Sequence, residues 1–127
     1  MRGRGAARTL VAGLLGVLLS CEPATRADPF EAWGADIASS GQVLFMGFTR
    51  RGEQISGNAE LADLLGPRPG ELMRVTGTRR GDSLDLTFQR PFGGSYRFVG
   101  RYVAGEAGLS GTLDGGAFAQ VAISFSR

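Results

Sequence analysis

The fold is decided by the stretch LDLTFQ, residues 84–89, in which every second residue is apolar. Leu84, Leu86 and Phe88 alternate with three polar residues, so their side chains would all project from one face of a β-strand. The stretch LSGTLD at residues 109–114 repeats this order, with Gly111 between two leucines. A strand with one apolar and one polar face is typical of an antiparallel sheet that covers a core on one side.

The same alternation continues along the chain in short segments that are separated by turns rich in Gly and Pro. The predicted strands are 42–49, 54–64, 71–79, 83–90, 95–103, 108–114 and 117–126. Five segments carry an apolar residue two positions before a glycine, which favours strands that coil around a narrow cylinder. Closing such a sheet removes its exposed edges. We therefore predict an all-β domain over residues 42–127, a small up-and-down antiparallel meander barrel of about seven to eight strands.

The segment before this domain carries the signals of a short helix. Asp28-Pro29-Phe30-Glu31 combines a capping residue, a proline at the first helical position and an acid three residues after the cap. Phe30, Trp33 and Ile37 follow at spacings of three and four, and Ser39-Ser40-Gly41 can end the helix. We expect a short N-terminal helix here, in front of the barrel.

The N-terminus has the features of an export signal. Arg2, Arg4 and Arg8 precede an apolar run at residues 10–19, which is too short to span a bilayer. The run ends in Leu18-Leu19-Ser20-Cys21, which resembles the lipobox of bacterial lipoproteins. The resemblance implies that the signal peptide, residues 1–20, is removed and that Cys21 becomes a lipid-carrying N-terminus. The alternative is an ordinary signal peptide that is cleaved elsewhere, such as after Ala27.

The cysteine content agrees with lipidation. Cys21 is the only cysteine, so the chain cannot form an internal disulfide, and a free thiol in an oxidising compartment needs a reason. Acyl chains such as palmitate would hold a small domain at a membrane. We therefore expect residues 21–41 to supply the lipidated cysteine, a tether and the helix. The predicted location is a bacterial cell envelope, with the outer membrane favoured over the inner where there are two.

A repeated motif links two of the predicted turns. Residues 49–55 read TRRGEQI and residues 78–84 read TRRGDSL. The second copy contains Arg80-Gly81-Asp82, the tripeptide that animal cell-adhesion receptors read. Because the first copy has Glu in place of Asp, the repeat favours a shared turn geometry over receptor recognition.

The same repeat predicts a basic rim. Alternate turns of an up-and-down barrel share one end, so Arg50, Arg51, Arg79 and Arg80 should gather there beside the turn at residues 105–108. The chain should enter the first strand from the opposite rim. Guanidinium groups suit carboxylates and phosphates, which makes this rim a candidate surface for an envelope glycan, lipid or protein. The alternative is a set of solvated hairpin ends balanced by nearby acids.

The composition argues against catalysis. The chain has no histidine, and all 14 of its basic residues are arginine. The usual general base, the commonest zinc ligand and the lysine of phosphate loops are therefore missing. Asp82, Asp85 and Asp114 do not have the spacing of a calcium loop. Three arginines belong to the signal, so the basic precursor charge does not indicate nucleic acid. We expect no enzyme, no cofactor and no metal site.

Two functions stay open for the domain. A barrel of about eight strands is either filled by its side chains or holds one small molecule, as lipocalins do. The candidate lining residues, which can equally be plain core, are Phe45, Val75, Leu84, Leu86, Phe88, Phe98, Tyr102, Leu109 and Leu113. The Gly-x-Trp signature of a lipocalin's first strand is absent, because Trp33 follows Glu31-Ala32. Over residues 42–127 the chain resembles small Gly-rich β-meander lipoproteins of unknown function. We expect a non-catalytic interaction or structural module, with a lipocalin-like carrier of a small apolar ligand as the alternative.

Overall fold

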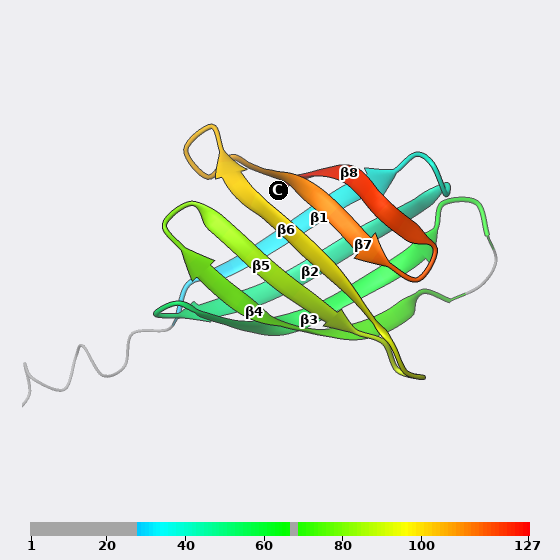
Figure 1. The fold of residues 1–127 in the computed structure, drawn as a ribbon, viewed down its shortest axis with the longest axis horizontal. Coiled ribbons are helices and arrows are strands. Elements are labelled where there is room, and N and C mark those ends of the chain that lie inside the picture. Colours follow the sequence, from blue (N-terminus) through cyan, green and yellow to red (C-terminus); the bar gives the residue numbers. More distant parts are fainter. Residues whose placement is uncertain (1–27, 67–68) are drawn as a thin grey trace, which may run out of the picture.

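A closed barrel of eight antiparallel strands makes up the domain (Figure 1). The computed structural model describes residues 28–66 and 69–127, so the predicted export signal, Cys21 and the predicted tether lie outside the described residues. Each strand pairs with the next along the chain, and the last pairs with the first. The strands are β1 (Phe30–Ile37), β2 (Gln42–Arg51), β3 (Gln54–Asp63), β4 (Glu71–Arg80), β5 (Ser83–Gln89), β6 (Ser95–Val103), β7 (Gly108–Gly115) and β8 (Phe118–Ser126). The prediction of an all-β, up-and-down meander barrel is confirmed.

The seven predicted strands correspond to β2 through β8, with bounds that differ by two residues at most. They are recovered because each carries the period-two pattern that a one-sided core requires. In β5, Leu84, Leu86 and Phe88 are all buried, and the residues between them face outward. No helix in the described ranges is long and apolar enough to cross a membrane.

The predicted N-terminal helix is wrong, because residues 30–37 form β1 and the barrel begins at Phe30 rather than at residue 42. The inward side chains Glu31, Trp33, Ala35 and Ile37 are buried at a period of two, whereas Phe30 points outward and is 65% exposed. The helical spacing of Phe30, Trp33 and Ile37 was therefore accidental. Eight residues that can pair with β2 along their whole length are held by that ladder, which overrides the local capping signal.

Four strand glycines stand where neighbouring backbones come close together. Gly57, Gly77, Gly100 and Gly111 point inward, and a Cβ on any of them would collide with the backbone of an adjacent strand. At Gly77 the collision would be with the carbonyl oxygen of Asp85. These glycines let the strands coil tightly, as predicted for a narrow cylinder. The fifth, Gly47, faces outward instead and lies under the ring of Phe30.

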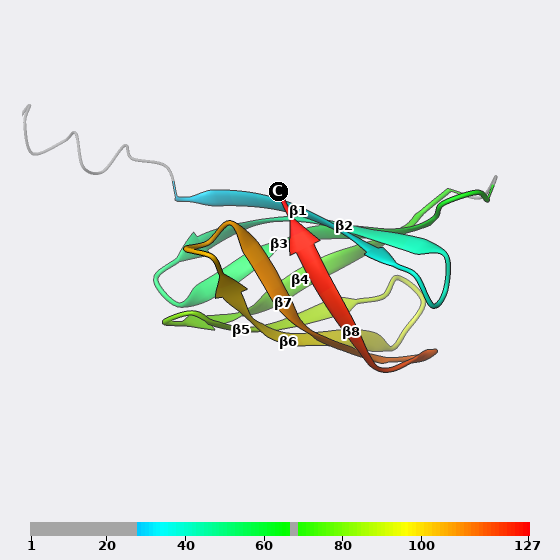
Figure 2. The ribbon, with the colours of Figure 1, turned by 90° about the horizontal axis from the view of Figure 1, so that it is seen from above.

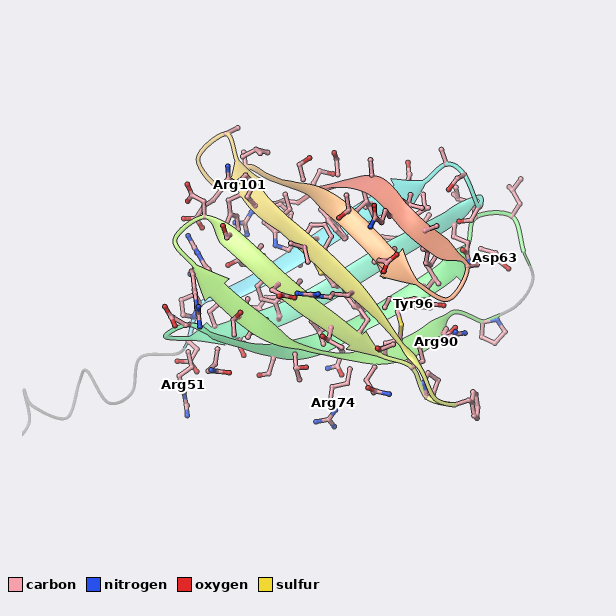
Figure 3. All side chains as sticks on the ribbon, in the orientation of Figure 1. Arg51, Asp63, Arg74, Arg90, Tyr96 and Arg101 are labelled. Carbon is pink, nitrogen blue, oxygen red and sulfur yellow. The ribbon has the colours of Figure 1, made fainter. Side chains whose placement is uncertain are left out.

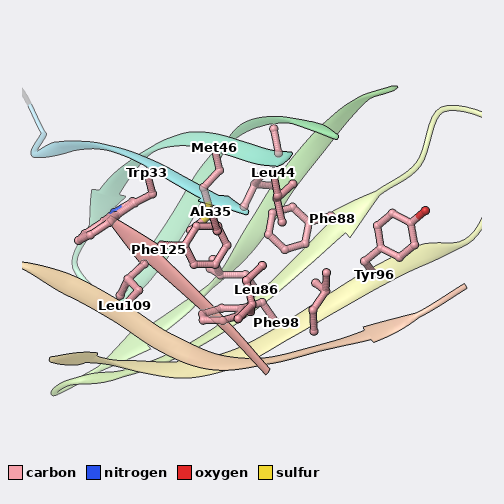
Figure 4. Packing of buried hydrophobic residues seen from close by; sticks show 14 of the residues in the cluster. Trp33, Ala35, Leu44, Met46, Leu86, Phe88, Tyr96, Phe98, Leu109 and Phe125 are labelled. Carbon is pink, nitrogen blue, oxygen red and sulfur yellow. The ribbon is translucent and has the colours of Figure 1, made fainter. Parts of the chain in front are cut away.

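The barrel interior is filled by side chains. One cluster of 22 buried apolar residues occupies the interior, and Figure 4 shows the rings of Phe88, Phe98 and Phe125 packed among aliphatic side chains. The Phe98 and Phe125 rings meet edge to face with their centroids 5.2 Å apart. Side chains from all eight strands contribute, so every strand of the closed sheet packs against the same core.

The two TRRG motifs form equivalent hairpins at one end of the barrel, as predicted. Each hairpin turns through two residues, Gly52-Glu53 and Gly81-Asp82, and the glycines have φ values of 61° and 59°. Glycine with positive φ at the first central position is the geometry of a type II′ turn, which suits tight hairpins. The Arg-Gly-Asp tripeptide therefore belongs to a hairpin turn that its Glu-containing copy also adopts.

The chain enters the barrel at the end opposite to the predicted one. Because residues 30–37 form a strand, Phe30 pairs with Thr49 beside the β2–β3 turn, and the chain enters at the end that carries the TRRG hairpins. The expectation that it enters from the opposite rim is wrong for the same reason as the helix. Figure 3 shows Arg51 and Arg101 at this end, with Arg90 and Tyr96 at the other.

Candidate functional site: the arginine-lined mouth

The end of the barrel where the chain enters carries the candidate site. We call it the arginine mouth, made of Glu31, Arg50, Arg51, Arg79, Arg80, Tyr102, Glu106 and Arg127. The structure brings the four predicted arginines together here from the ends of β2 and β4. They are not equivalent, because alternation along each strand turns one arginine of each pair inward and the other outward.

Glu31 is the centre of the mouth. Its carboxylate is 3% exposed, and Oε1 accepts hydrogen bonds from Tyr102 Oη at 2.7 Å and from Trp33 Nε1 at 3.1 Å. Arg50 Nε lies 2.5 Å from Oε2 as an ion pair, although its N–H is not aligned for a hydrogen bond. A buried carboxylate requires such partners, because removing a charge from water costs several kcal/mol. Glu31 is therefore held as part of the core.

Arg50 and Arg79 turn inward and close the mouth. Their side chains are 22% and 15% exposed, and both reach the carboxylate of Glu106, at 4.0 Å and 3.4 Å. The Arg79 guanidinium also stacks on the ring of Tyr102, 4.2 Å from its centroid, and its Nε donates to the Gly81 carbonyl at 2.8 Å. These two arginines are engaged within the protein, so a partner could recruit them only by breaking these contacts.

Arg51 and Arg80 turn outward and are largely free of the protein. Their side chains are 87% and 78% exposed, and each has one loose ion pair, Arg51 with Asp28 at 3.4 Å and Arg80 with Glu53 at 3.8 Å. Exposed pairs of this kind contribute about 0 to 1 kcal/mol and exchange readily for other anions. Of the four predicted arginines, these two are the ones that an anionic partner can reach.

The environment of Tyr102 holds its phenol in the neutral form. Burial is the first cause that raises the pKa of Tyr102 above its ordinary value, and the hydrogen bond and negative charge of Glu31 raise it further. The guanidinium groups of Arg79 and Arg50 lower the pKa and offset part of this shift. Tyr102 therefore acts as a donor to Glu31 over the ordinary pH range.

Sequence reasoning missed Glu31 and Arg127 of the mouth, and it placed the turn that carries Glu106 at this rim without assigning Glu106 a contact. Glu31 was assigned to a helix, although its place two residues before Trp33 in an alternating run could have marked it as inward. Glu106 lies in the β6–β7 turn with φ of 74°, an unusual backbone state for a residue with a side chain. Arg127 stacks on Trp33, 4.3 Å from the ring centroid, and donates to the Glu106 carbonyl at 3.2 Å. No local pattern pointed to Arg127 or to the ion pairs of Glu106.

The predicted lining residues divide into interior and exterior. Eight of the nine are buried in the single core cluster, Val75, Leu84, Leu86, Phe88, Phe98, Tyr102, Leu109 and Leu113. Phe45 is 52% exposed on the outer wall, where its ring covers Gly34 across the β1–β2 pair. Trp33 lies in the first strand after all, where a lipocalin has its tryptophan, but Glu31 stands in the place of the signature glycine.

Comparisons with known proteins assign no family. No family model, no curated protein and no solved structure matches this chain. The function therefore has to be argued from the barrel and its surface.

Proposed function

We propose that this protein is a lipid-anchored, non-catalytic interaction module of the bacterial cell envelope. The observation that carries the proposal is the filled interior. Eight of the nine candidate lining residues pack into one cluster of 22 buried apolar side chains. We therefore assign the binding of partners to the outer surface. A lipocalin-like carrier would instead need a hollow of about 300 Å³ or more for its ligand.

Both ends of the core are covered by the same kind of contact. Tyr102 and Tyr96 stand at opposite ends of β6, and each carries an arginine on its ring, Arg79 at 4.2 Å and Arg90 at 4.9 Å. Arg90 is held in turn by Glu71, whose Oε1 accepts from Arg90 Nε at 2.7 Å. An arginine stacked on a tyrosine at each end favours a packed barrel over a barrel with an open interior.

The anchor and the arginine mouth would lie at the same end of the molecule. Six residues lie between Cys21 and Asp28, and the seven steps from one to the other span at most about 25 Å when fully extended. On this proposal, Arg51 and Arg80 face the membrane that holds the lipid, where anionic headgroups are the nearest partners. Surface attraction of this kind is worth about 1 kcal/mol per arginine.

The anchor is tested in the producing bacterium. Cells are grown with an alkyne analogue of palmitate, and wild-type protein is compared with Cys21→Ala by labelling and by membrane fractionation. We expect label and membrane association only for the wild type. A Cys21→Ala variant that stays in the membrane fraction, or a wild type that takes up no label, would reject the lipid anchor.

A further inference from the structure

The barrel is closed by a short contact between β1 and β8, which we call the seam. This pair has one residue pair in its ladder, Gly34 with Ser126, whereas every other neighbouring pair of strands has between seven and ten. Figure 2 shows β8 meeting β1 near its own C-terminal end and running obliquely away from it. Continuing the register would pair Asp36 with Ser124, and these residues fall outside the ladder. The seam therefore offers strand edges that the barrel itself does not pair.

A groove of about 790 Å³ follows the seam. Apart from Asp36, its outward-facing residues on the two strands are small, Ala32 and Gly34 on β1 and Ala122, Ser124 and Ser126 on β8. Small side chains at a sheet edge let another backbone approach closely. Because the two strands diverge, parts of the inward residues Trp33, Ala35 and Ile123 are accessible from outside and form the base of the groove.

Larger side chains supply walls and charges. Val43, Phe45 and Leu64 line the far side of the groove, and Phe45 and Leu64 are 52% and 58% exposed. Arg127 lies at the end of the groove near the arginine mouth, and Asp36 lies two residues past Gly34 in β1. The groove therefore has opposite charges at different points along its length. Apolar surface beside a free strand edge is the arrangement by which proteins bind extended peptides.

We propose that the seam is a docking site for an extended peptide segment of a partner protein, which takes the place of the single Gly34–Ser126 pair and adds to the sheet as a strand between β1 and β8. Backbone groups of the peptide would pair with the free edges, running antiparallel to one strand and parallel to the other. Alternate side chains would rest on Phe45 and Leu64. A basic residue is favoured near Asp36, and an acidic residue is favoured near Arg127, whose side chain is 45% exposed beside its contacts with Trp33 and Glu106.

Other occupants fit the seam less well. An acyl chain would cover the apolar wall, but it has no groups that pair with the amides and carbonyls of a strand edge. Within the described ranges, each strand of a second copy is already paired on both sides except at the same seam. An extended peptide satisfies the backbone, the small residues and the two charges together. This inference deepens the proposed function, on which it rests, by naming the class of partner.

The test uses the mature protein in detergent and a displayed library of seven-residue peptides without Gly or Pro. The affinity of selected peptides is measured by fluorescence polarisation for wild type, Ser124→Trp and Ser110→Trp. Ser124 lies in the groove, while Ser110 is its exposed partner on the other side, in β7, so the two variants add the same ring to neighbouring outer positions. We expect Ser124→Trp to lose affinity by about ten-fold or more and Ser110→Trp to bind as wild type.

Two further measurements make the outcome independent of folding defects. A peptide methylated on its backbone nitrogens should bind at least about ten-fold more weakly to the wild type, because it cannot pair with a strand edge. Hydrogen exchange of β1 and of the first half of β8 should slow when the unmodified peptide binds. A library that yields no binder, or peptides that bind all variants and the methylated form alike, would overturn the proposal.

Sedimentation separates peptide docking from self-association. Dimers that Ser124→Trp converts to monomers would identify a second copy as the occupant and overturn the peptide assignment. None of these measurements depends on the lipid. Failure of peptide binding would leave the anchored module intact, and failure of palmitate labelling at Cys21 would leave the seam site intact.

Discussion

At the residue scale, the arginine mouth is organised around one buried carboxylate. Glu31 accepts hydrogen bonds from Tyr102 and Trp33 and pairs with Arg50, which joins β1, β2 and β6 at one end of the barrel. A buried pair of this kind contributes little compared with an apolar core, yet breaking it leaves an uncompensated charge. The mouth is therefore sensitive to the loss of Glu31 and much less sensitive to the loss of an exposed partner.

Replacing Glu31 with Ala should lower the free energy of unfolding by about 3 to 5 kcal/mol, since Arg50 and the two donors lose their acceptor. The matched control is Glu106→Ala, which removes a carboxylate that is 43% exposed from the same cluster. That change should cost less than about 1 kcal/mol. Urea unfolding followed by tryptophan fluorescence measures both values. Equal losses would contradict the central place given to Glu31.

The raised pKa of Tyr102 makes stability fall in alkali. The unfolded chain ionises its tyrosines near pH 10, while the folded chain keeps Tyr102 protonated, so the unfolded state gains from rising pH. The stability that Tyr102 contributes is present below pH 10 and is lost as the pH rises through the folded pKa. Tyr102→Phe should therefore unfold more readily at pH 7 and show a flatter decline between about pH 9.5 and 11. Parallel curves for wild type and variant in pH-dependent urea melts would refute this.

At the element scale, the sequence predicts seven of the eight strands and fails at β1. Segments such as 83–89 alternate without a competing signal, whereas residues 28–37 carry alternation and helix capping together. The strand is favoured over the helix only because this segment pairs with both β2 and β8. That pairing cannot be read from the local sequence. The helix prediction also concealed the inward position of Glu31 and placed Trp33 outside the sheet. It put the entry of the chain at the wrong end of the barrel. Phe45 shows a second limit, because an apolar residue in a strand can also cover a glycine on the outer wall.

The hairpin assignment at Gly81 is tested by a pair of substitutions. Gly81 has φ of 59° with open space where a Cβ would stand, so Gly81→Val introduces backbone strain alone. We expect a loss of about 1 to 2 kcal/mol in the free energy of unfolding. Asp82→Glu copies the first motif and should change stability by less than about 0.5 kcal/mol. Negligible effects of both changes in thermal unfolding would count against the turn.

The role of inward glycines is tested by comparing Gly77 with Gly47. A Cβ at Gly77 would collide with the Asp85 carbonyl and lie 2.9 Å from Leu86 Cα, so Gly77→Ala should cost about 1 to 3 kcal/mol. A Cβ at Gly47 would meet the ring of Phe30 at 2.9 Å, and that ring is exposed and can turn away. Gly47→Ala should cost less than about 0.5 kcal/mol. Denaturant midpoints that rank the two in the opposite order would contradict tight coiling.

At the scale of the whole molecule, the barrel is filled within, covered at both ends and joined weakly along one side. The core occupies the place where a carrier would hold its ligand, and the Arg79–Tyr102 and Arg90–Tyr96 stacks cover its ends. Fold and strand bounds follow from alternation, which is local. The seam and the arginine mouth depend on which strands meet at closure, so the sequence alone could place some of their residues but not their contacts.

Mass spectrometry of the protein purified from the producing cell distinguishes a filled barrel tethered through Cys21 from an untethered barrel or one that carries a ligand. Spectra are recorded under denaturing and native conditions on the same sample. We expect a chain that begins at residue 21 and carries acyl mass on its first residue, with the same mass in both spectra. An unmodified N-terminus, or an additional small molecule that is present under native conditions and lost on denaturation, would contradict it.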